Sequence, residues 1–385
     1  MYNFIYKAKN SYKIMLLFVA LVNYCAPPAN WKGSQYLAGA QIRQRKATVS
    51  LVRGKASKVK VKIHYGVAQR IYTANRSQTE FYFKDRKGKV EKGSGSYLPY
   101  ASGVFKPRRN YFKLNKKIYK GFLSIKKQGN KYLYVNIVSL DEYLMSVVGH
   151  EMSPNWPIEA LKAQAIVART YLINKVKQRK NNFYQVDATT NDQVYKGINK
   201  TGRAKLKKAV IGTKGIIVTF FGKPANVFFH ASSGGVTARS SEVWGTDLPY
   251  LKNVKVPFSK GKHAKNWYIS FSKSKLSQLL HLPLIKKLRI SKRSSSGRVK
   301  QLIAYTTKGK KYISGSNFRR KLGAIKVKST LFAIRQKGKR VKISGRGYGH
   351  GVGLDQWATK YMAEKHYSYQ KIIRLFFPGT SISSS

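Results

Sequence analysis

Acidic residues are scarce in this sequence. Only 13 of its 385 residues are Asp or Glu, against 76 Lys and Arg, and the formal net charge is +63. A surface of this kind attracts polyanions such as nucleic acids, anionic lipid headgroups or acidic wall polymers, and charge alone does not choose among them. Because 42% of the residues are hydrophobic and 13% aromatic, the composition excludes a disordered polycation and predicts folded cores.

Cysteine and long apolar runs are also nearly absent. Cys25 is the single cysteine, so an intramolecular disulfide is impossible and cysteine usage does not reveal the redox compartment. Three lysines precede the apolar run 14–22, which is too short to span a bilayer comfortably. We therefore expect an export signal over residues 1–26 and a location in the periplasm or cell wall. Lipidation of Cys25 would anchor the chain to a membrane, but the large residues before it favour a passive cysteine.

The remaining sequence divides by pattern into two parts. Residues 30–104 are basic and rich in β-branched residues and turn signals, and the alternation in 58–63 predicts a strand with one buried and one cationic face. Residues 105–385 mix helix and strand patterns, with a basic insertion around 257–335 that contains no acid. The expected fold class is α+β, with a β-rich N-terminal part followed by a mixed helix and strand catalytic core.

Local signals place several elements. Ser139 and Glu142 form a capping-box pattern that begins a helix, and Gly149 is expected to end it. Pro157 begins a second helix. The chain should form a strand over 132–138, a hairpin following 212–215, and two short helices around 356–365 and 369–377. A mobile loop is expected over 291–297.

Glu151 stands out among the few acids. Asp141, Glu142 and Glu159 lie where the first turn of a helix favours negative charge, but Glu151 falls between the two helices. If Glu151 closes the first helix, its carboxylate faces the negative end of the helix dipole, which favours the protonated form that a general acid requires. The alternative is a salt bridge to one of the many cations, for instance Arg169.

The segments around Glu151 resemble those of a known family. The stretches 139–152 and 156–171, with Gly149-His150-Glu151-Met152 and Ala163-Gln164-Ala165 at their centres, resemble the signature of the stage II sporulation protein D and LytB family of cell-wall proteins. The resemblance continues through 187–197, 230–237 and 347–358, and covers roughly residues 105–380.

This resemblance implies a peptidoglycan lytic transglycosylase with Glu151 as catalytic acid and base. Glu151 would protonate the glycosidic oxygen and then accept the proton of the sugar's own 6-hydroxyl as that oxygen closes on C1. Because the nucleophile is intramolecular, no second carboxylate is needed. Relatives named as amidase enhancers imply an alternative, in which the protein binds the wall and activates a separate amidase.

Asp187 and Asp192 remain candidates for a second carboxylate, which hydrolysis would require. Hydrogen bonding within a turn is the favoured alternative for both. Gln164 and Arg169 would orient Glu151 or hold substrate, or else make buried contacts to the backbone.

Further candidates for substrate binding lie in the other matching segments. The alternating glycines from 345 to 353 would let a glycan approach the backbone, or would relieve crowding in a tightly packed strand. The full set of expected substrate-binding residues is Gln164, Arg169, Gln193, Tyr195, His230, Ser232, Ser233, Tyr348, His350, Gln356 and Trp357.

No cofactor or metal is expected. Some members of the family place cysteines near the segment of His230 that would help to bind zinc, but this chain has Ser232 and Ser233 and no thiol there. The expected partners are peptidoglycan glycan strands, an amidase, and anionic wall polymers or a membrane surface. Nucleic acid is not expected, because the sequence has no helix-turn-helix, aromatic RNA-binding signature or zinc finger.

Overall fold

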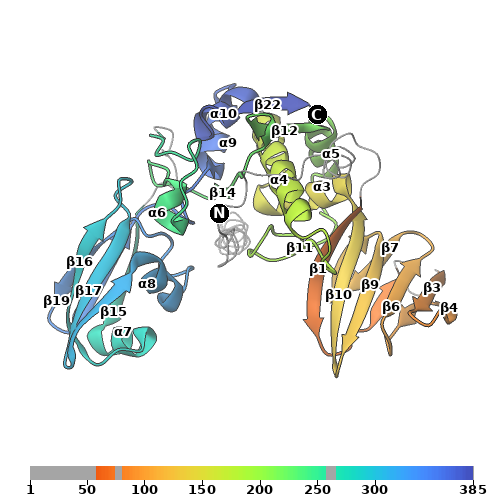
Figure 1. The fold of residues 1–385 in the computed structure, drawn as a ribbon, viewed down its shortest axis with the longest axis horizontal. Coiled ribbons are helices and arrows are strands. Elements are labelled where there is room, and N and C mark those ends of the chain that lie inside the picture. Colours follow the sequence, from red (N-terminus) through yellow and green to blue (C-terminus); the bar gives the residue numbers. More distant parts are fainter. Residues whose placement is uncertain (1–57, 74–79, 257–265, 385) are drawn as a thin grey trace, which may run out of the picture. The chain divides into compact units, whose positions relative to one another are not determined.

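The computed structural model describes residues 58–73, 80–256 and 266–384 (Figure 1). The predicted export signal and Cys25 lie outside the described residues. The chain forms two compact units: an N-terminal unit that extends to Asn226 and also includes the strand at 381–384, and a C-terminal unit, Val227–Thr380. Both helices and strands are present and the N-terminal part is rich in strands, so the predicted α+β class is confirmed. Among the described helices, none combines the length and the apolar character that crossing a bilayer requires.

The N-terminal unit contains a seven-stranded sheet with the order β11-β1-β10-β9-β6-β3-β4, in which only β1 and β11 are parallel. Its strands are β1 (Lys58–Gly66), β3 (Glu80–Asp85), β4 (Val90–Ser94), β6 (Gly103–Pro107), β9 (Phe122–Gln128), β10 (Lys131–Ser139) and β11 (Val186–Asp187). In β1, Val59 and Val61 are buried while Lys58 and Lys60 are exposed, which confirms the predicted alternation. The predicted boundary between residues 104 and 105 falls inside β6.

Two smaller sheets complete the strands of this unit. The first has the order β5-β2-β7-β8 and the second β13-β12-β22. Their strands are β2 (Ile71–Thr73), β5 (Ser96–Tyr97), β7 (Tyr111–Leu114), β8 (Lys117–Lys120), β12 (Ile216–Phe220), β13 (Lys223–Pro224) and β22 (Ser381–Ser384). The predicted hairpin is the antiparallel pair β12 and β13.

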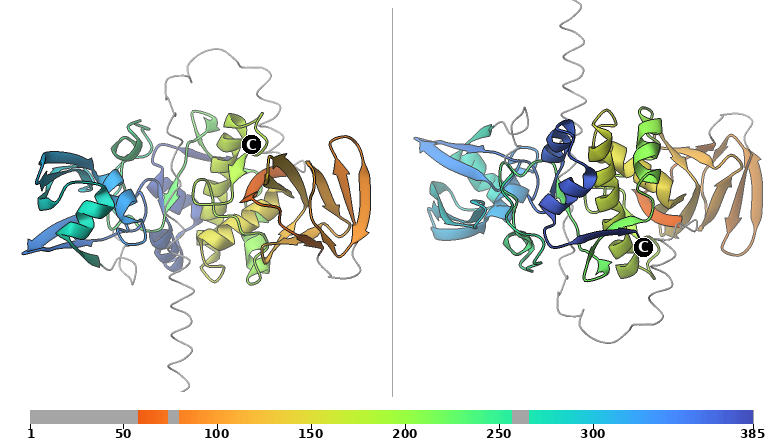
Figure 2. Two further views of the ribbon diagram at one scale, coloured as in Figure 1. Left: turned by 90° about the horizontal axis from the view of Figure 1, so that it is seen from below. Right: turned by 90° about the horizontal axis from the view of Figure 1, so that it is seen from above.

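Three helices pack together beside the strand-rich part of the same unit (Figure 2). They are α3 (Leu140–Glu151), α4 (Ile158–Gln178) and α5 (Arg203–Ile211). Ser139 caps α3 as predicted, because its side chain accepts a hydrogen bond from the Glu142 N–H. A capping box also needs a second hydrogen bond, in which the Glu142 carboxylate accepts the Ser139 N–H. This part of the prediction is wrong, because the Glu142 carboxylate binds Lys120 and Arg203 instead. Glu142 thereby connects the start of α3 to β8 and α5.

Gly149 does not end α3. The helix continues through Glu151, so the prediction that Gly149 marks its end is wrong. A Cβ at position 149 would lie 2.4 Å from Nδ2 of Asn199 and 2.7 Å from Cδ1 of Leu206. Glycine is therefore present because α5 and the Asn199 segment pack against the helix backbone, and not because a left-handed terminus requires it.

The C-terminal unit contains a strand-rich part and two terminal helices, which gather at different ends of the unit (Figures 1 and 2). The strand-rich part has the sheets β15-β20-β19 and β16-β17-β18. Its elements are β15 (Trp267–Ser272), α7 (Lys273–Leu280), β16 (Ile285–Arg293), β17 (Val299–Thr306), β18 (Gly309–Ser314), α8 (Gly315–Leu322), β19 (Phe332–Lys337) and β20 (Arg340–Gly345). The two sheets and two helices share one apolar core, which includes Trp267, Leu302 and Phe318.

The rest of the C-terminal unit places the motif residues. The parallel pair β14 (Phe229–His230) and β21 (Leu354–Asp355) joins the segments 230–237 and 347–358, which carry part of the family resemblance. A short helix, α6 (Ser240–Trp244), follows β14. The predicted helices near the C-terminus are confirmed as α9 (Gln356–Glu364) and α10 (Tyr369–Phe376).

The loop predicted over 291–297 is shorter in the structure. Strand β16 extends to Arg293, so the prediction is wrong for 291–293, and a turn follows at 294–297. The hydroxyls of Ser294, Ser295 and Ser296 all donate to the carboxylate of Glu242. These bonds overcome burial and hold the pKa of Glu242 below its usual value. The serine-rich composition therefore supplies donors to a half-buried carboxylate.

We predict that Gly149→Ala destabilises the protein by about 1–3 kcal/mol, because the added methyl group overpacks the contact with Asn199 and Leu206. Urea unfolding monitored by circular dichroism measures this change. Helix propensity alone predicts the opposite, a gain of about 0.5–1 kcal/mol, so a stabilised variant would contradict the packing explanation.

Candidate active site

Glu151 is the last residue of α3, and not a residue between the two helices as the expected end at Gly149 implied. The condition under which its carboxylate lies at the negative end of the helix dipole is therefore met, and its side chain is buried, with 6% of its surface exposed. Its Oε1 atom accepts a hydrogen bond of 2.9 Å from the backbone N–H of Val194. The chain leaves the helix in an extended conformation at Met152. Glu151 is thus held at a helix terminus by a donor from a distant loop.

The neighbouring His150 is electrically neutral near pH 7. Burial lowers its pKa to about 4, although a contact of 2.7 Å between Nδ1 and the carbonyl oxygen of Ser146 opposes the shift. His150 therefore brings no positive charge to the end of α3.

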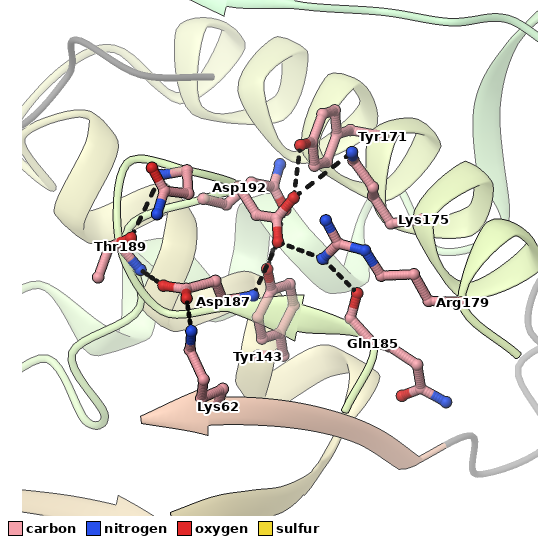
Figure 3. A network of polar contacts seen from close by, with 11 residues as sticks. Lys62, Tyr143, Tyr171, Lys175, Arg179, Gln185, Asp187, Thr189 and Asp192 are labelled. Carbon is pink, nitrogen blue, oxygen red and sulfur yellow. Dashed lines mark hydrogen bonds and ion pairs between the residues drawn. The ribbon is translucent and has the colours of Figure 1, made fainter. Parts of the chain in front are cut away.

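The loop that carries Val194 is fixed by Asp192 (Figure 3). The Asp192 carboxylate is 1% exposed and accepts hydrogen bonds from the Tyr171 hydroxyl, the Arg179 guanidinium and the Asp187 N–H, at 3.0, 2.6 and 2.8 Å. Lys175 Nζ lies 3.5 Å from it. Tyr171 and Lys175 come from α4 and Arg179 is the C-cap residue of that helix, so Asp192 attaches the loop to α4.

Asp187 has a structural role in the same network. Its Oδ1 accepts the N–H of Thr189, two residues ahead, in the manner of an Asx turn, and its other oxygen pairs with Lys62 of β1. Burial alone would raise the pKa of Asp187, but the bonds from Lys62 and Thr189 outweigh it and lower that pKa. Both aspartates therefore make hydrogen bonds within the turn region, which is the alternative to a second catalytic carboxylate that the sequence favoured.

Gln193 and Tyr195 also lie inside this network. Gln193 Oε1 accepts the Tyr143 hydroxyl at 3.0 Å, and the Tyr195 hydroxyl donates to Asn136 Oδ1 at 2.6 Å. Both side chains are buried, and burial raises the pKa of Tyr195 well above its ordinary value. Their observed contacts position the Val194 loop against α3 and the sheet.

The two candidates on α4 differ. Arg169 donates to the carbonyl oxygens of Val210 and Ile216, so it has the backbone partners that the sequence left as an alternative, and it braces the connection from α5 to β12. Gln164 is also buried, but no hydrogen bond to its amide oxygen or nitrogen is formed within the described residues. An unsatisfied buried amide costs free energy, which makes Gln164 available to bind a ligand or water.

The other seven candidates lie together in the C-terminal unit. The rings of His230 and His350 are 5.6 Å apart, centre to centre, and Ser232 pairs with Tyr348 through two backbone hydrogen bonds. Trp357 packs against Ala231 and Tyr348. The structure thus brings the segments 230–233 and 348–357 together, as their matching to one family signature implied.

Burial governs the charges in this cluster. It lowers the pKa of His230 to about 3 and that of His350 well below its ordinary range, so both imidazoles are neutral at pH 7. The Nε2 atoms of both rings and Nε2 of Gln356 have no hydrogen-bond partner within the described residues. These three side chains are the polar groups of the cluster with unused hydrogen-bonding capacity.

Asp355 is a residue of this cluster that sequence reasoning missed. Its carboxylate caps α9 by accepting the Ala358 N–H and also accepts the Ser233 N–H at 2.7 Å. Its acidic character in so basic a chain could have drawn attention to it. Burial raises the pKa of Asp355, and these hydrogen bonds oppose the shift. Its contacts explain why Ser233 lies beside the start of α9.

The glycine-rich segment is tightly packed. A Cβ at Gly351 would lie 2.2 Å from the guanidinium of Arg298, and one at Gly353 would lie 2.2 Å from the carbonyl oxygen of Phe228. Both glycines also have positive φ, which other residues rarely adopt. Crowding is therefore the observed reason for these two glycines. The segment from Gly347 to Gly353 is an irregular loop, in which every second residue is a glycine with positive φ, and not the strand that this alternative assumed.

Metal binding has no structural support in the described chain. Across residues 58–73, 80–256 and 266–384, no three His, Cys, Asp or Glu side chains form a group that could hold a metal ion. His230 directs Nδ1 to the Val352 carbonyl oxygen at 3.1 Å, and hydroxyls stand at positions 232 and 233.

Comparisons with known proteins identify the family of the chain. A family model described as Stage II sporulation protein matches residues 128–220, which contain Glu151 and the Val194 loop. Stage II sporulation protein D of Bacillus amyloliquefaciens is 32% identical over 267 residues, which cover 65% of this chain and 76% of that protein. The chain belongs to the stage II sporulation protein D family. The resemblance read from the sequence is therefore confirmed.

Two further relatives extend the match. An uncharacterised protein of Brachyspira hyodysenteriae is 30% identical over 325 residues, or 83% of this chain and 86% of that protein. The protein named Amidase enhancer of Bacillus subtilis is 29% identical over 292 residues, or 63% of this chain and 40% of that protein. A second family model, a domain of unknown function (DUF8618), matches residues 262–353 of this family member.

We predict that Asp192→Asn destabilises the protein by about 3–5 kcal/mol, because it removes the charge that compensates buried Lys175 and partly buried Arg179. Glu80→Gln is the control, since its pair with Arg108 is exposed and contributes at most about 1 kcal/mol. Thermal and urea unfolding measure both. Equal, small effects in the two variants would refute the anchoring role of Asp192.

Proposed function

We propose that this protein cleaves peptidoglycan glycan strands as a lytic transglycosylase, with Glu151 as general acid and general base. The observation that carries the proposal is the buried Glu151 carboxylate at the end of α3, held by the Val194 N–H inside the region that matches the family model. Glu142, which binds Lys120 and Arg203, and Asp192, which binds Arg179, instead have contacts that join elements of the fold.

The proposed reaction needs one carboxyl group. Glu151 donates its proton to the glycosidic oxygen while the bond from that oxygen to C1 of the muramic acid unit breaks. The 6-hydroxyl oxygen of the same sugar then forms the new bond to C1, and its proton passes to Glu151. The product carries a 1,6-anhydro ring, and the acid is regenerated without a water molecule being consumed.

The hydrogen bond from Val194 suits this cycle. A backbone N–H that points at Oε1 stabilises the ionised carboxylate, which is the form present between the two proton transfers. Because the nucleophile belongs to the substrate, the proposed reaction needs no catalytic role for Asp187 or Asp192. Their structural contacts count against a hydrolytic mechanism that would use either of them.

A second candidate function is supported by the relative named Amidase enhancer. In this alternative the protein binds the wall and stimulates a separate amidase, and Glu151 is not needed for binding. In both alternatives we propose a location in the cell envelope, which the export signal expected at residues 1–26 supports.

The test is mass spectrometry of the soluble products released from intact and from peptide-stripped peptidoglycan. We expect 1,6-anhydro-muramyl products from the native protein and at least about a 100-fold slower release from Glu151→Gln, because general acid–base catalysis contributes roughly 10²–10⁴-fold. Glu159→Gln is the matched control, since Glu159 lies in the first turn of α4 and pairs with Lys162.

The other outcomes are equally informative. Products with reducing ends would contradict the transglycosylase and indicate hydrolysis. If neither the native protein nor Glu151→Gln releases products, but both stimulate an added amidase equally, the enhancer alternative replaces the enzyme.

A further inference from the structure

One sheet of the C-terminal unit has two contrasting faces. In the sheet β15-β20-β19, the side chains of Trp267, Phe271, Phe332, Val341 and Ile343 are buried in the apolar core. The alternating residues point the other way and are exposed. Four of them are cations, which we call the basic face: Arg335, Lys337, Arg340 and Lys342.

The cations of the basic face are placed against one another. Strands β19 and β20 form an antiparallel hairpin in which Lys342 is paired directly with Arg335, and Arg340 directly with Lys337. Like charges in directly opposed positions destabilise a sheet. At strand spacings the four Cα atoms form a rectangle of about 4.8 Å by about 6.7 Å, so the repulsion acts in both directions.

Nothing in the surrounding sequence compensates this charge. The segment 262–353 contains 25 Lys and Arg residues and no Asp or Glu. Within the described residues, none of the four cations of the basic face forms an ion pair, and the one side-chain hydrogen bond among them joins Arg340 to the Ser270 hydroxyl at 3.4 Å. A bound polyanion would remove the repulsion that the fold leaves in place.

We propose that the basic face binds a linear phosphodiester polymer, with successive phosphates lying along the β19–β20 hairpin. The two guanidinium groups can each hold a phosphate through paired N–H donors, and the two ammonium groups add point charges between them. A chain with one phosphate per short repeat matches cations that recur every second residue along each strand.

The same face fits two other polyanions poorly. Single-stranded nucleic acid is bound by successive aromatic side chains on which bases stack, and Tyr268 is the aromatic residue that this face exposes. A membrane surface is usually bound with a set of inserted apolar side chains, which the basic face does not present. Both polyanions are included in the test.

The experiment uses the full-length protein and poly(glycerol phosphate) as the probe, with binding measured at several salt concentrations. The test variant is R335Q/K337Q/R340Q/K342Q. We expect the slope of log K against log salt to become shallower by about 3, since each phosphate contact contributes roughly 0.7 on a single flexible strand.

The control carries the same change in net charge on four exposed lysines that lie on separate elements or loops. It is K60Q/K92Q/K207Q/K365Q. We expect its slope to change by less than about 1, because no closely spaced contact is removed. Equal weakening in both variants would overturn the proposal and leave a general effect of net charge.

Two more measurements separate the remaining explanations. If single-stranded DNA or phosphatidylglycerol vesicles bind more tightly than poly(glycerol phosphate), and this binding is lost in the same variant, that ligand replaces the proposed partner.

The melting temperature of the variant R335Q/K337Q/R340Q/K342Q should stay level or rise, because opposed like charges are removed. A fall would show that these cations stabilise the hairpin and would contradict the argument. The polymer contains no glycan, so the result is independent of cleavage by Glu151.

Discussion

The Asp192 carboxylate connects the features on which the candidate active site depends. It binds Tyr171 and Lys175 of α4, Arg179 at the C-cap of that helix, and the N–H of Asp187. It thereby fixes the loop that leads to Val194. The Val194 N–H in turn holds Glu151. A buried ion network in the loop is therefore a condition for the position of a carboxylate at the end of a different helix.

The few other acids act in a comparable way. Glu142 joins α3 to β8 and α5, Glu242 gathers three serine hydroxyls, and Asp355 connects the Ser233 loop to α9. In a chain of charge +63, a carboxylate finds donors readily, and a single one can organise several segments. The scarcity of acids thus concentrates their structural effect at the sites where segments distant in sequence meet.

The cations divide into two groups with different physical roles. Arg169 and Arg298 are buried and donate to backbone carbonyl oxygens, which satisfies the carbonyls of irregular connections. The four cations of the basic face are exposed and opposed in register instead. Buried arginines explain part of the basic composition through folding, whereas the four cations of the basic face form no ion pair within the described residues.

The sequence by itself determined the elements with strong local periodicity and singled out Glu151 as the candidate catalytic residue. The alternation in β1, the Ser139 cap of α3 and the helices α9 and α10 follow from neighbouring residues alone, and a carboxylate without a first-turn role was visible in the sequence. Only the tertiary structure decided the rest. Gly149 continues a helix because Asn199 and Leu206 pack against it, and Ser294 is ordered because Glu242 accepts its hydroxyl. Each outcome depends on a partner more than 45 residues away, which a local pattern cannot specify.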